Sequence, residues 1–502
     1  MRARRARLVV VGAMMKNAPL WVVPLLAILS VGVAGAEDSL IDAIKAGDAP
    51  LVERLITDAI NINATETDGT TALHWAAHRN HLKLAELLLA AGASADPTNR
   101  YGVTPLALAS INGSAPMIAR LLEAGADANR SNPEGEMPLM VAARTGNVDA
   151  VRALLAHGAA VDAAEGWRGQ TALMWAAAQN QIAAAEALIR AGADVNARSE
   201  GGFTPLLFAA REGHVEALGV LVAAGANVDD TLPKTEMSAL VLAVFNAEYD
   251  FADALLSAGA DANAEAHGWT ALHQVVWTRR PNLGRNPPFP VPLGELDGLD
   301  MVRALVSAGA NVDARQTTEP RDGNRNMLRR LGSTAFLQAA KVADVEMMRL
   351  LVELGADPAV TTEEGVTPLM AAAGVGIWKI GENPGTNEEA LEAVTLAWEL
   401  GNDVNAVDAN GDTALHGAIH RGAEDIVRFL VENGGDIDAV NAKGWSALSI
   451  AQGVFYPNTF NRHPHLVTLL TELGADPDTG TRRPEDLSPE ERLAAAAQLQ
   501  QP

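Results

Sequence analysis

The heptapeptide TALHWAA, Thr71–Ala77, decides how this chain folds, because versions of it return along most of the 502 residues. The later copies read TPLALAS, TALMWAA, TPLLFAA, TALHQVV, TPLMAAA and TALHGAI, and they begin at Thr104, Thr171, Thr204, Thr270, Thr367 and Thr413. A Thr followed by Pro or Ala suits the start of a helix, since the hydroxyl caps free amides and Pro in the first turn loses no hydrogen bond. Repetition at this spacing predicts an array of like units.

A glycine stands where the second helix of each unit must stop, in a left-handed position that favours this residue. These glycines are Gly92, Gly125, Gly158, Gly192, Gly225, Gly259, Gly309, Gly355, Gly401, Gly434 and Gly474. Successive steps between them are 33, 33, 34, 33, 34, 50, 46, 46, 33 and 40 residues. The unit is therefore about 33 residues long, and the sizeable insertions all fall in the C-terminal half.

The repeated phrase closely resembles the T-P-L-H-x-A signature of the ankyrin repeat family, and the resemblance covers residues 39 to 478. It implies an all-α ankyrin-repeat solenoid of about twelve helix-turn-helix units with short hairpin loops. We expect a capping repeat at 37–69, regular repeats at 70–268, and repeats with insertions at 269–478. A closing helix is expected within 479–502, because the array must cover its exposed end.

The overall composition excludes several classes of function. Hydrophobic residues make up 48% of the chain but aromatic residues only 4%, which suits short, closely packed helices. Cysteine is absent, so disulfides, thiolate metal sites and Cys nucleophiles are excluded. The net charge of −24 repels phosphates and argues against a nucleic-acid partner.

The first 36 residues have the form of an export signal. Five basic residues precede the uncharged run from Ala18 to Ala36, which ends in the small-x-small pattern of a cleavage site. We expect cleavage after Ala36 and a periplasmic or secreted protein. The alternative is an uncleaved membrane anchor, since 19 such residues can just span a bilayer. The excess of Arg over Lys and the abundance of Ala favour a bacterial source.

Four insertions interrupt the regular spacing, at 278–298, 316–331, 375–389 and 453–465. Three fall between the two helices of a unit, and the one at 316–331 extends a hairpin. Insertions in alternate units stand about 20 Å apart if helices pack at 8–10 Å, so they could touch or form a continuous ledge.

Arginines gather in the first two insertions of this otherwise acidic chain. We expect them to receive an anionic ligand or an acidic partner, or alternatively to pair with the array's own carboxylates and fix the loops. They are Arg279, Arg280, Arg285, Arg321, Arg325, Arg329 and Arg330.

Aromatic residues occupy two columns of the aligned units. Trp75, Trp175 and Phe208 lie within the first helix, where the family usually carries a framework residue, and packing is expected of them. Phe203, Trp269 and Trp445 lie just before that helix, in a column that in ankyrin proteins tends to face the concave binding surface. We predict that these three bind a partner, with Trp167 at a hairpin tip as an addition.

Other polar patterns invite a catalytic or metal interpretation that the sequence does not favour. His74, His273 and His416 occupy the H of the repeated phrase, which in the family ties neighbouring hairpins together. The DANGDT stretch from Asp408 lacks the sixth-position glycine and twelfth-position acid of a calcium loop. His463 and His465 are a close pair for which metal binding is a minor alternative. Catalytic motifs and nucleotide-binding loops are missing, so we expect no enzyme, cofactor or metal.

The sequence thus predicts a non-catalytic scaffold that binds a partner protein through the concave groove and inserted loops. One alternative is a binding protein or enzyme for a small anionic ligand seated between the stack and its insertions. Two further alternatives are an accessory protein supporting a periplasmic redox enzyme and a purely structural role at the cell envelope.

Overall fold

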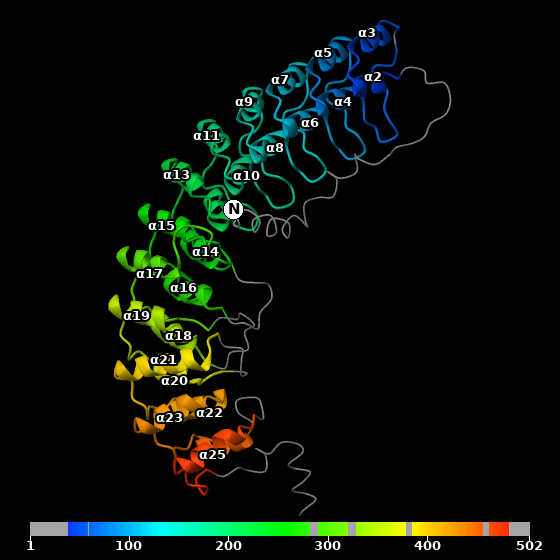
Figure 1. Cartoon of the computed structure of the whole chain (residues 1–502). Coiled ribbons are helices and arrows are strands. Elements are labelled where there is room, and N and C mark those ends of the chain that lie inside the picture. The colour runs from blue at the N-terminus through cyan, green and yellow to red at the C-terminus, as the bar shows by residue number, and fades with distance from the viewer. Residues whose placement is uncertain are drawn as a thin grey trace, which may run out of the picture.

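Pairs of antiparallel helices follow one another along the whole described chain in the computed structural model (Figure 1). The structure describes residues 39–58, 60–281, 290–319, 328–377, 384–454 and 461–480. These residues hold 24 helices, α2 to α25, and one two-residue antiparallel pair, β1 (Glu265–Ala266) and β2 (Trp269–Thr270).

Each unit contributes one inner and one outer helix. The inner helices are α2 (Leu40–Ala46), α4 (Ala72–His78), α6 (Pro105–Asn112), α8 (Pro138–Thr145), α10 (Ala172–Ala178), α12 (Pro205–Glu212), α14 (Ala239–Phe245), α16 (Ala271–Arg279), α18 (Ala335–Lys341), α20 (Pro368–Ala373), α22 (Ala414–Arg421) and α24 (Ala447–Gly453). The outer helices are α3 (Ala49–Thr57), α5 (Leu82–Ala90), α7 (Ala115–Glu123), α9 (Val148–Ala156), α11 (Ile182–Arg190), α13 (Val215–Ala223), α15 (Tyr249–Ser257), α17 (Gly298–Ser307), α19 (Val345–Glu353), α21 (Asn387–Glu399), α23 (Glu424–Glu432) and α25 (Pro464–Glu472).

The units stack into a curved array, with the inner helices on the concave side and the outer helices on the convex side (Figure 1). Buried Ala and Leu side chains from all units form one continuous core, from Leu40 to Ala475. The predicted all-α solenoid of twelve helix pairs is therefore confirmed. Each unit buries its apolar face against its neighbours, so the described residues share one elongated core.

The repeated Thr and His perform the same task in several units. Thr71 caps α4, and its backbone N–H donates to His74 Nδ1 at 3.1 Å. His74 Nδ1 is therefore unprotonated, and Nε2 donates to the carbonyl of Val103 in the next unit at 3.0 Å. His273 and His416 make the same bonds, to Ser333 O and Trp445 O. The structural interpretation of these histidines is confirmed.

A second tie between units comes from Asn residues in the hairpins. Asn196 donates from Nδ2 to Gly225 O at 3.2 Å and accepts from Asn227 N at 3.0 Å. The same pair of bonds to the following unit is made by Asn129, Asn263 and Asn405. Sequence analysis assigned these phrases to tight turns and missed that the side chains join consecutive units.

The inserted segments are bounded by helices in the structure. Helix α16 continues to Arg279, α17 begins at Gly298, α21 begins at Asn387, and α24 ends at Gly453. These helices thus include the outermost residues of the expected insertions at 278–298, 375–389 and 453–465. The expected export signal and closing helix lie outside the described residues, apart from Thr479 and Gly480.

Candidate partner-binding surface

The concave face of the N-terminal half carries an inner aromatic row, defined as Trp75, Trp175, Phe203, Phe245 and Trp277. Phe245 is 40% exposed, and the other four rings are half-buried, those of Trp75, Trp175 and Phe203 against the core. Phe245 stacks on Trp277 with ring centroids 6.4 Å apart, and Phe203 lies 5.2 Å from Phe208. Ile111, 39% exposed on α6, adds an aliphatic side chain to this face.

Cationic side chains lie over several of these rings. The Lys45 ammonium is 4.5 Å from the centre of the Trp75 ring, and the Arg144 guanidinium is 5.4 Å from that of Trp175. Arg211 lies over both Phe203 and Phe208. Each cation also has a carboxylate partner, Glu66, Glu136 or Glu212, so the row is amphipathic and close to neutral. Rings and guanidinium groups are the side chains most frequent among energetic anchors of protein interfaces.

The concave face of the C-terminal half is filled by the chain itself. At the position of Trp75, the tenth and eleventh units carry Ala371 and Gly417, both fully covered. A Cβ on Gly417 would meet Val375 N at 2.5 Å, so inserted backbone lies directly on α22. Small residues at this position of α20 and α22 make room for the insertion, so the aromatic row does not continue at these two positions.

The insertions also contact one another. Leu328 N donates to Gly376 O at 3.2 Å, which joins the hairpin insertion to the insertion after α20. Leu328, Val375 and Ile377 are each under 5% exposed. The described ends of these two insertions are therefore part of the packed array.

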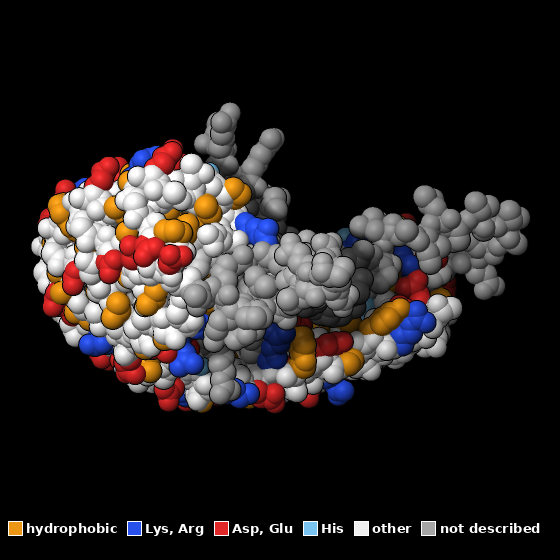
Figure 2. All heavy atoms as spheres, turned by 90° about the horizontal axis from the view of Figure 1, so that it is seen from below, with side chains coloured by type: hydrophobic (Ala, Val, Ile, Leu, Met, Phe, Trp, Pro, Cys, Tyr) orange, Lys and Arg blue, Asp and Glu red, His pale blue; other side chains and the backbone are white. Residues whose placement is uncertain are grey.

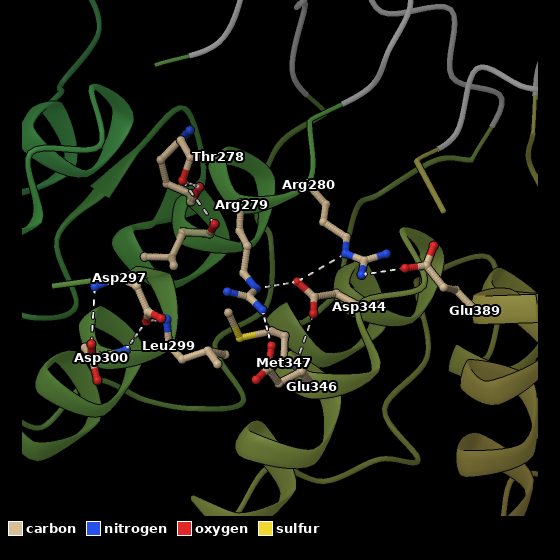
Figure 3. A network of polar contacts seen from close by, with 12 residues as sticks. Thr278, Arg279, Arg280, Asp297, Leu299, Asp300, Asp344, Glu346, Met347 and Glu389 are labelled. Atoms are coloured by element: carbon tan, nitrogen blue, oxygen red, sulfur yellow. Dashed lines mark hydrogen bonds and ion pairs between the residues drawn. The ribbon is translucent and has the colours of Figure 1, made fainter. Parts of the chain in front are cut away.

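An ion-pair network fixes the start of the first insertion (Figure 3). Arg279 Nε lies 2.8 Å from Asp344 Oδ2 and also pairs with Glu346, while Arg280 Nη2 lies 2.9 Å from Glu389 Oε1. Asp344 is completely buried and caps α19 through Met347 N. The hydrogen bond that the Arg280 guanidinium donates to Glu389 is the largest cause that lowers the pKa of this carboxyl group. Units eight, nine and ten are thereby bound together.

The predicted arginines are mostly neutralised by the protein's own groups. Arg329 is exposed but lies 3.1 Å from Glu364, and Arg330 is buried beside Glu319 and over the Trp269 ring. With Arg279 and Arg280, these contacts correspond to the alternative in which the arginines fix the loops. Arg285, Arg321 and Arg325 lie outside the described residues.

The predicted aromatic column requires a correction. Trp445 is 2% exposed and Trp269 is 7% exposed, so neither presents a free ring to a partner. The carbonyl of Trp445 accepts a hydrogen bond from His416 Nε2. Trp269 packs edge-on against Trp277, and the Arg330 guanidinium lies over its ring. Phe203 is half-buried within the inner aromatic row, and Trp167 is 63% exposed at its hairpin tip.

Sequence reasoning missed Ile111, Phe245 and Trp277. They stand three residues after the framework column of Trp75, one helical turn further on. An apolar residue at that outward position, read across the aligned phrases, is the signal that could have identified them.

The remaining polar candidates behave as structural groups. Asp408 Oδ1 accepts from the amides of Asn410 and Asp412, as in an ordinary hairpin. Its burial, together with the nearby charge of Asp412, raises its pKa. A hollow of about 260 Å³ nearby is lined by three acids, Glu364, Asp408 and Asp412, and by two basic residues, Arg329 and Lys443.

The described residues hold no group of three or more His, Asp or Glu arranged to bind a metal ion. His463 and His465 lie edge to face with centroids 5.8 Å apart. Within the same residues, no helix has both the length and the apolar character needed to cross a bilayer.

Laterally stacked helix pairs with an open concave face define a helical solenoid, a class of repeat protein. This chain belongs to the ankyrin repeat family, since the family model for ankyrin repeats in three copies matches residues 40–132, 115–199, 169–231, 206–283 and 386–481. Ankyrin repeats generally act as protein-protein interaction scaffolds and are typically non-enzymatic.

Among curated proteins, the chain is similar to ankyrin repeat and SOCS box protein 16 of Homo sapiens and of Mus musculus. Each is 33% identical over 217 residues, which are 43% of this chain and 42% of the relative. The chain thus spans less than half the length of these relatives. Among solved structures, the human ASB11 ankyrin repeat domain is 29% identical, with a TM-score of 0.40, over 44% of this chain and 96% of that one.

Proposed function

We propose that this protein is a non-catalytic scaffold that binds a partner protein across the inner aromatic row of its N-terminal half. The observation that carries the proposal is the contrast between the two halves. Partly exposed rings line the concave face from α4 to α16, whereas inserted backbone covers the corresponding face at α22. The family's general role in protein recognition supports the same conclusion.

Shortening two exposed side chains of this face should weaken partner binding without unfolding the array. For Ile111→Ala combined with Phe245→Ala we expect about a thirtyfold loss of affinity, because each interface anchor contributes on the order of 1 kcal/mol or more. Surface plasmon resonance against the captured partner measures the change.

A matched control removes exposed aliphatic groups elsewhere, in Val407→Ala combined with Val440→Ala. These valines are 58% and 50% exposed in hairpins of the C-terminal half. Equal affinities for the two double variants would contradict the assignment of the partner to the N-terminal concave face.

The scaffold is proposed to act in the periplasm or extracellular space of a bacterium. The support is the basic start, uncharged run and small-x-small ending of the first 36 residues. Intact mass and N-terminal sequencing of the exported protein should place its first residue at Glu37. A chain recovered from the membrane fraction with residues 1–36 attached would contradict cleavage and indicate an anchor.

Recognition of a small anion is a second candidate function, favoured by Arg421. This residue is 6% exposed, its Nε donates to Asn387 Oδ1 at 3.1 Å, and its Nη2 donates to Thr386 O at 3.4 Å. Its Nη1 is buried and has no acceptor among the residues that the structure describes. Burial lowers the pKa of its guanidinium, a cost that a bound anion would offset.

Phosphate or succinate should therefore raise the thermal unfolding midpoint above that in chloride at equal ionic strength. The Arg421→Met variant should lose this anion-dependent shift. An identical shift in both proteins would show that Arg421 is not an anion site.

A further inference from the structure

Two hairpin tips of the N-terminal half each present an arginine stacked on an exposed ring. In the third unit, Arg100 lies 4.9 Å from the centre of the Tyr101 ring and donates to its hydroxyl at 2.6 Å. In the fifth unit, Arg168 lies 4.2 Å from the centre of the Trp167 ring. Tyr101 is 44% exposed and Trp167 is 63% exposed. We call these two pairs the tip pairs.

Neither guanidinium of the tip pairs has a carboxylate within 4.0 Å among the described residues. Many other exposed arginines of this acidic protein do have one, including Arg120, Arg130, Arg152, Arg190, Arg198 and Arg428. Glu200 lies on the neighbouring hairpin, and its amide donates to Arg168 O, yet its carboxylate does not pair with Arg168. A stacked guanidinium keeps its planar edge available for a bidentate bond to a carboxylate.

Neighbouring hairpin tips are joined by hydrogen bonds and close packing, which fix the spacing of the two tip pairs. Arg100 N donates to Asp68 O, and Glu200 N donates to Arg168 O, each at 2.8 Å. Between the pairs, Gly102 packs against Pro133, and Gly135 packs against Gly166, so closely that neither glycine has room for a Cβ. Units that stack at the spacing of packed helices, about 10 Å, place the tip pairs about 20 Å apart.

From this geometry we propose that the tip pairs bind an extended segment of the partner protein that carries two carboxylates about six residues apart. The spacing follows because an extended chain advances about 3.3 Å per residue. Exposed Glu134 occupies the tip between the pairs, so the middle of the segment is neutral or basic. Asp68 is the acid that acts electrostatically on Arg100, although it forms no ion pair with it. Acids more than about 8 Å away do not oppose binding strongly, because their charges are screened at physiological salt. The inference rests on the proposed scaffold function and names the chemistry of its partner.

The test uses the full chain and two fluorescein-labelled synthetic peptides with the same composition. In one peptide two glutamates stand about six residues apart among neutral residues, and in the other they are adjacent. Fluorescence anisotropy at about 0.15 M salt should give the spaced peptide a roughly tenfold lower Kd than the adjacent one. Arg100→Ala combined with Arg168→Ala should abolish this preference.

The matched control is Arg152→Ala combined with Arg190→Ala, which removes the same charge from ion-paired, exposed arginines on α9 and α11. This variant should bind the spaced peptide as the unchanged protein does. Equal binding of the two peptides, or equal losses in the two double variants, would reduce the effect to overall charge and overturn the proposal.

Binding of the natural partner by the two double variants distinguishes a failure of this inference from a failure of the proposed scaffold function. If the Ile111 and Phe245 variant loses the partner while the Arg100 and Arg168 variant keeps it, the scaffold stands and the tip pairs are not its acidic-segment site. If neither variant loses the partner, the concave binding surface itself is wrong.

Discussion

Lowering the pH from 7 to about 4.5 should destabilise the array by several kcal/mol through two buried histidines. His273 and His420 are 0% and 1% exposed, and burial is the largest cause that lowers the pKa of each to about 4. In the unfolded chain both regain a pKa near 6.5. Between pH 6.5 and 4 the unfolded state therefore binds more protons than the folded state, and stability decreases as the pH is lowered. The loss is roughly 2 kcal/mol for each ring at pH 4.5.

At His273, the bond that Thr270 N donates to Nδ1 opposes protonation in addition to burial. A proton on Nδ1 would remove this acceptor and place a charge in the core. Urea unfolding of the protein at both pH values measures the loss.

The double variant His273→Gln with His420→Gln isolates these two rings. Between pH 7 and pH 4.5 the unchanged protein should lose roughly 4 kcal/mol more unfolding free energy than this variant does. The control His157→Gln alters an exposed ring and should leave the pH dependence unchanged. The same slope in all three proteins would show that His273 and His420 do not cause the acid destabilisation.

Removal of the buried Asp344 carboxylate should cost about 3 kcal/mol of stability, because it leaves Arg279 without its buried partner. Asp344 is 0% exposed, whereas Arg279 retains 23% of its side-chain exposure. The Asp344→Ala variant also loses the cap at Met347 N. The expected result is a lower urea midpoint, with the first loss of structure in units eight to ten, measured by hydrogen exchange.

Glu346→Ala is the matched control, since Glu346 pairs with the same Arg279 but is 68% exposed. An exposed ion pair contributes about 0.5 kcal/mol or less, so this variant should be nearly as stable as the unchanged protein. Similar losses for the two variants would mean that the network does not depend on burial. The two results together test whether the insertion arginines are structural.

The insertion arginines show what the number of charges in a sequence can predict and what it cannot. Counting located Arg279, Arg280, Arg329 and Arg330 in an acidic chain but left two interpretations open. The structure places a carboxylate beside each of them. Arg330 pairs with Glu319 of its own insertion, but Arg279 and Arg280 pair with Asp344 and Glu389, which are 65 and 109 residues away. Basic and acidic side chains are interspersed over the face shown in Figure 2, and a count of charges does not tell which of them pair.

Aromatic columns show the same limit. The repeat alignment assigns Phe203, Trp269 and Trp445 to one column, yet only Phe203 retains a half-exposed ring. Trp269 and Trp445 are covered by the surrounding structure, including Arg330 over the former and Lys443 over the latter. The cover over Trp269 comes from a later segment of the chain, and alignment of one unit on another does not include it.

The sequence by itself determined the fold of this protein. Its signals are local and repeated, because Thr71 caps its own helix, His74 reaches only the next hairpin, and each apolar face packs on the neighbouring unit. The tertiary structure alone decided which surface is open. Burial and ion pairing at a given unit depend on segments that return from distant parts of the chain, as Val375 does over Gly417. Such contacts follow from how the units stack, and no spacing within a single repeat encodes them.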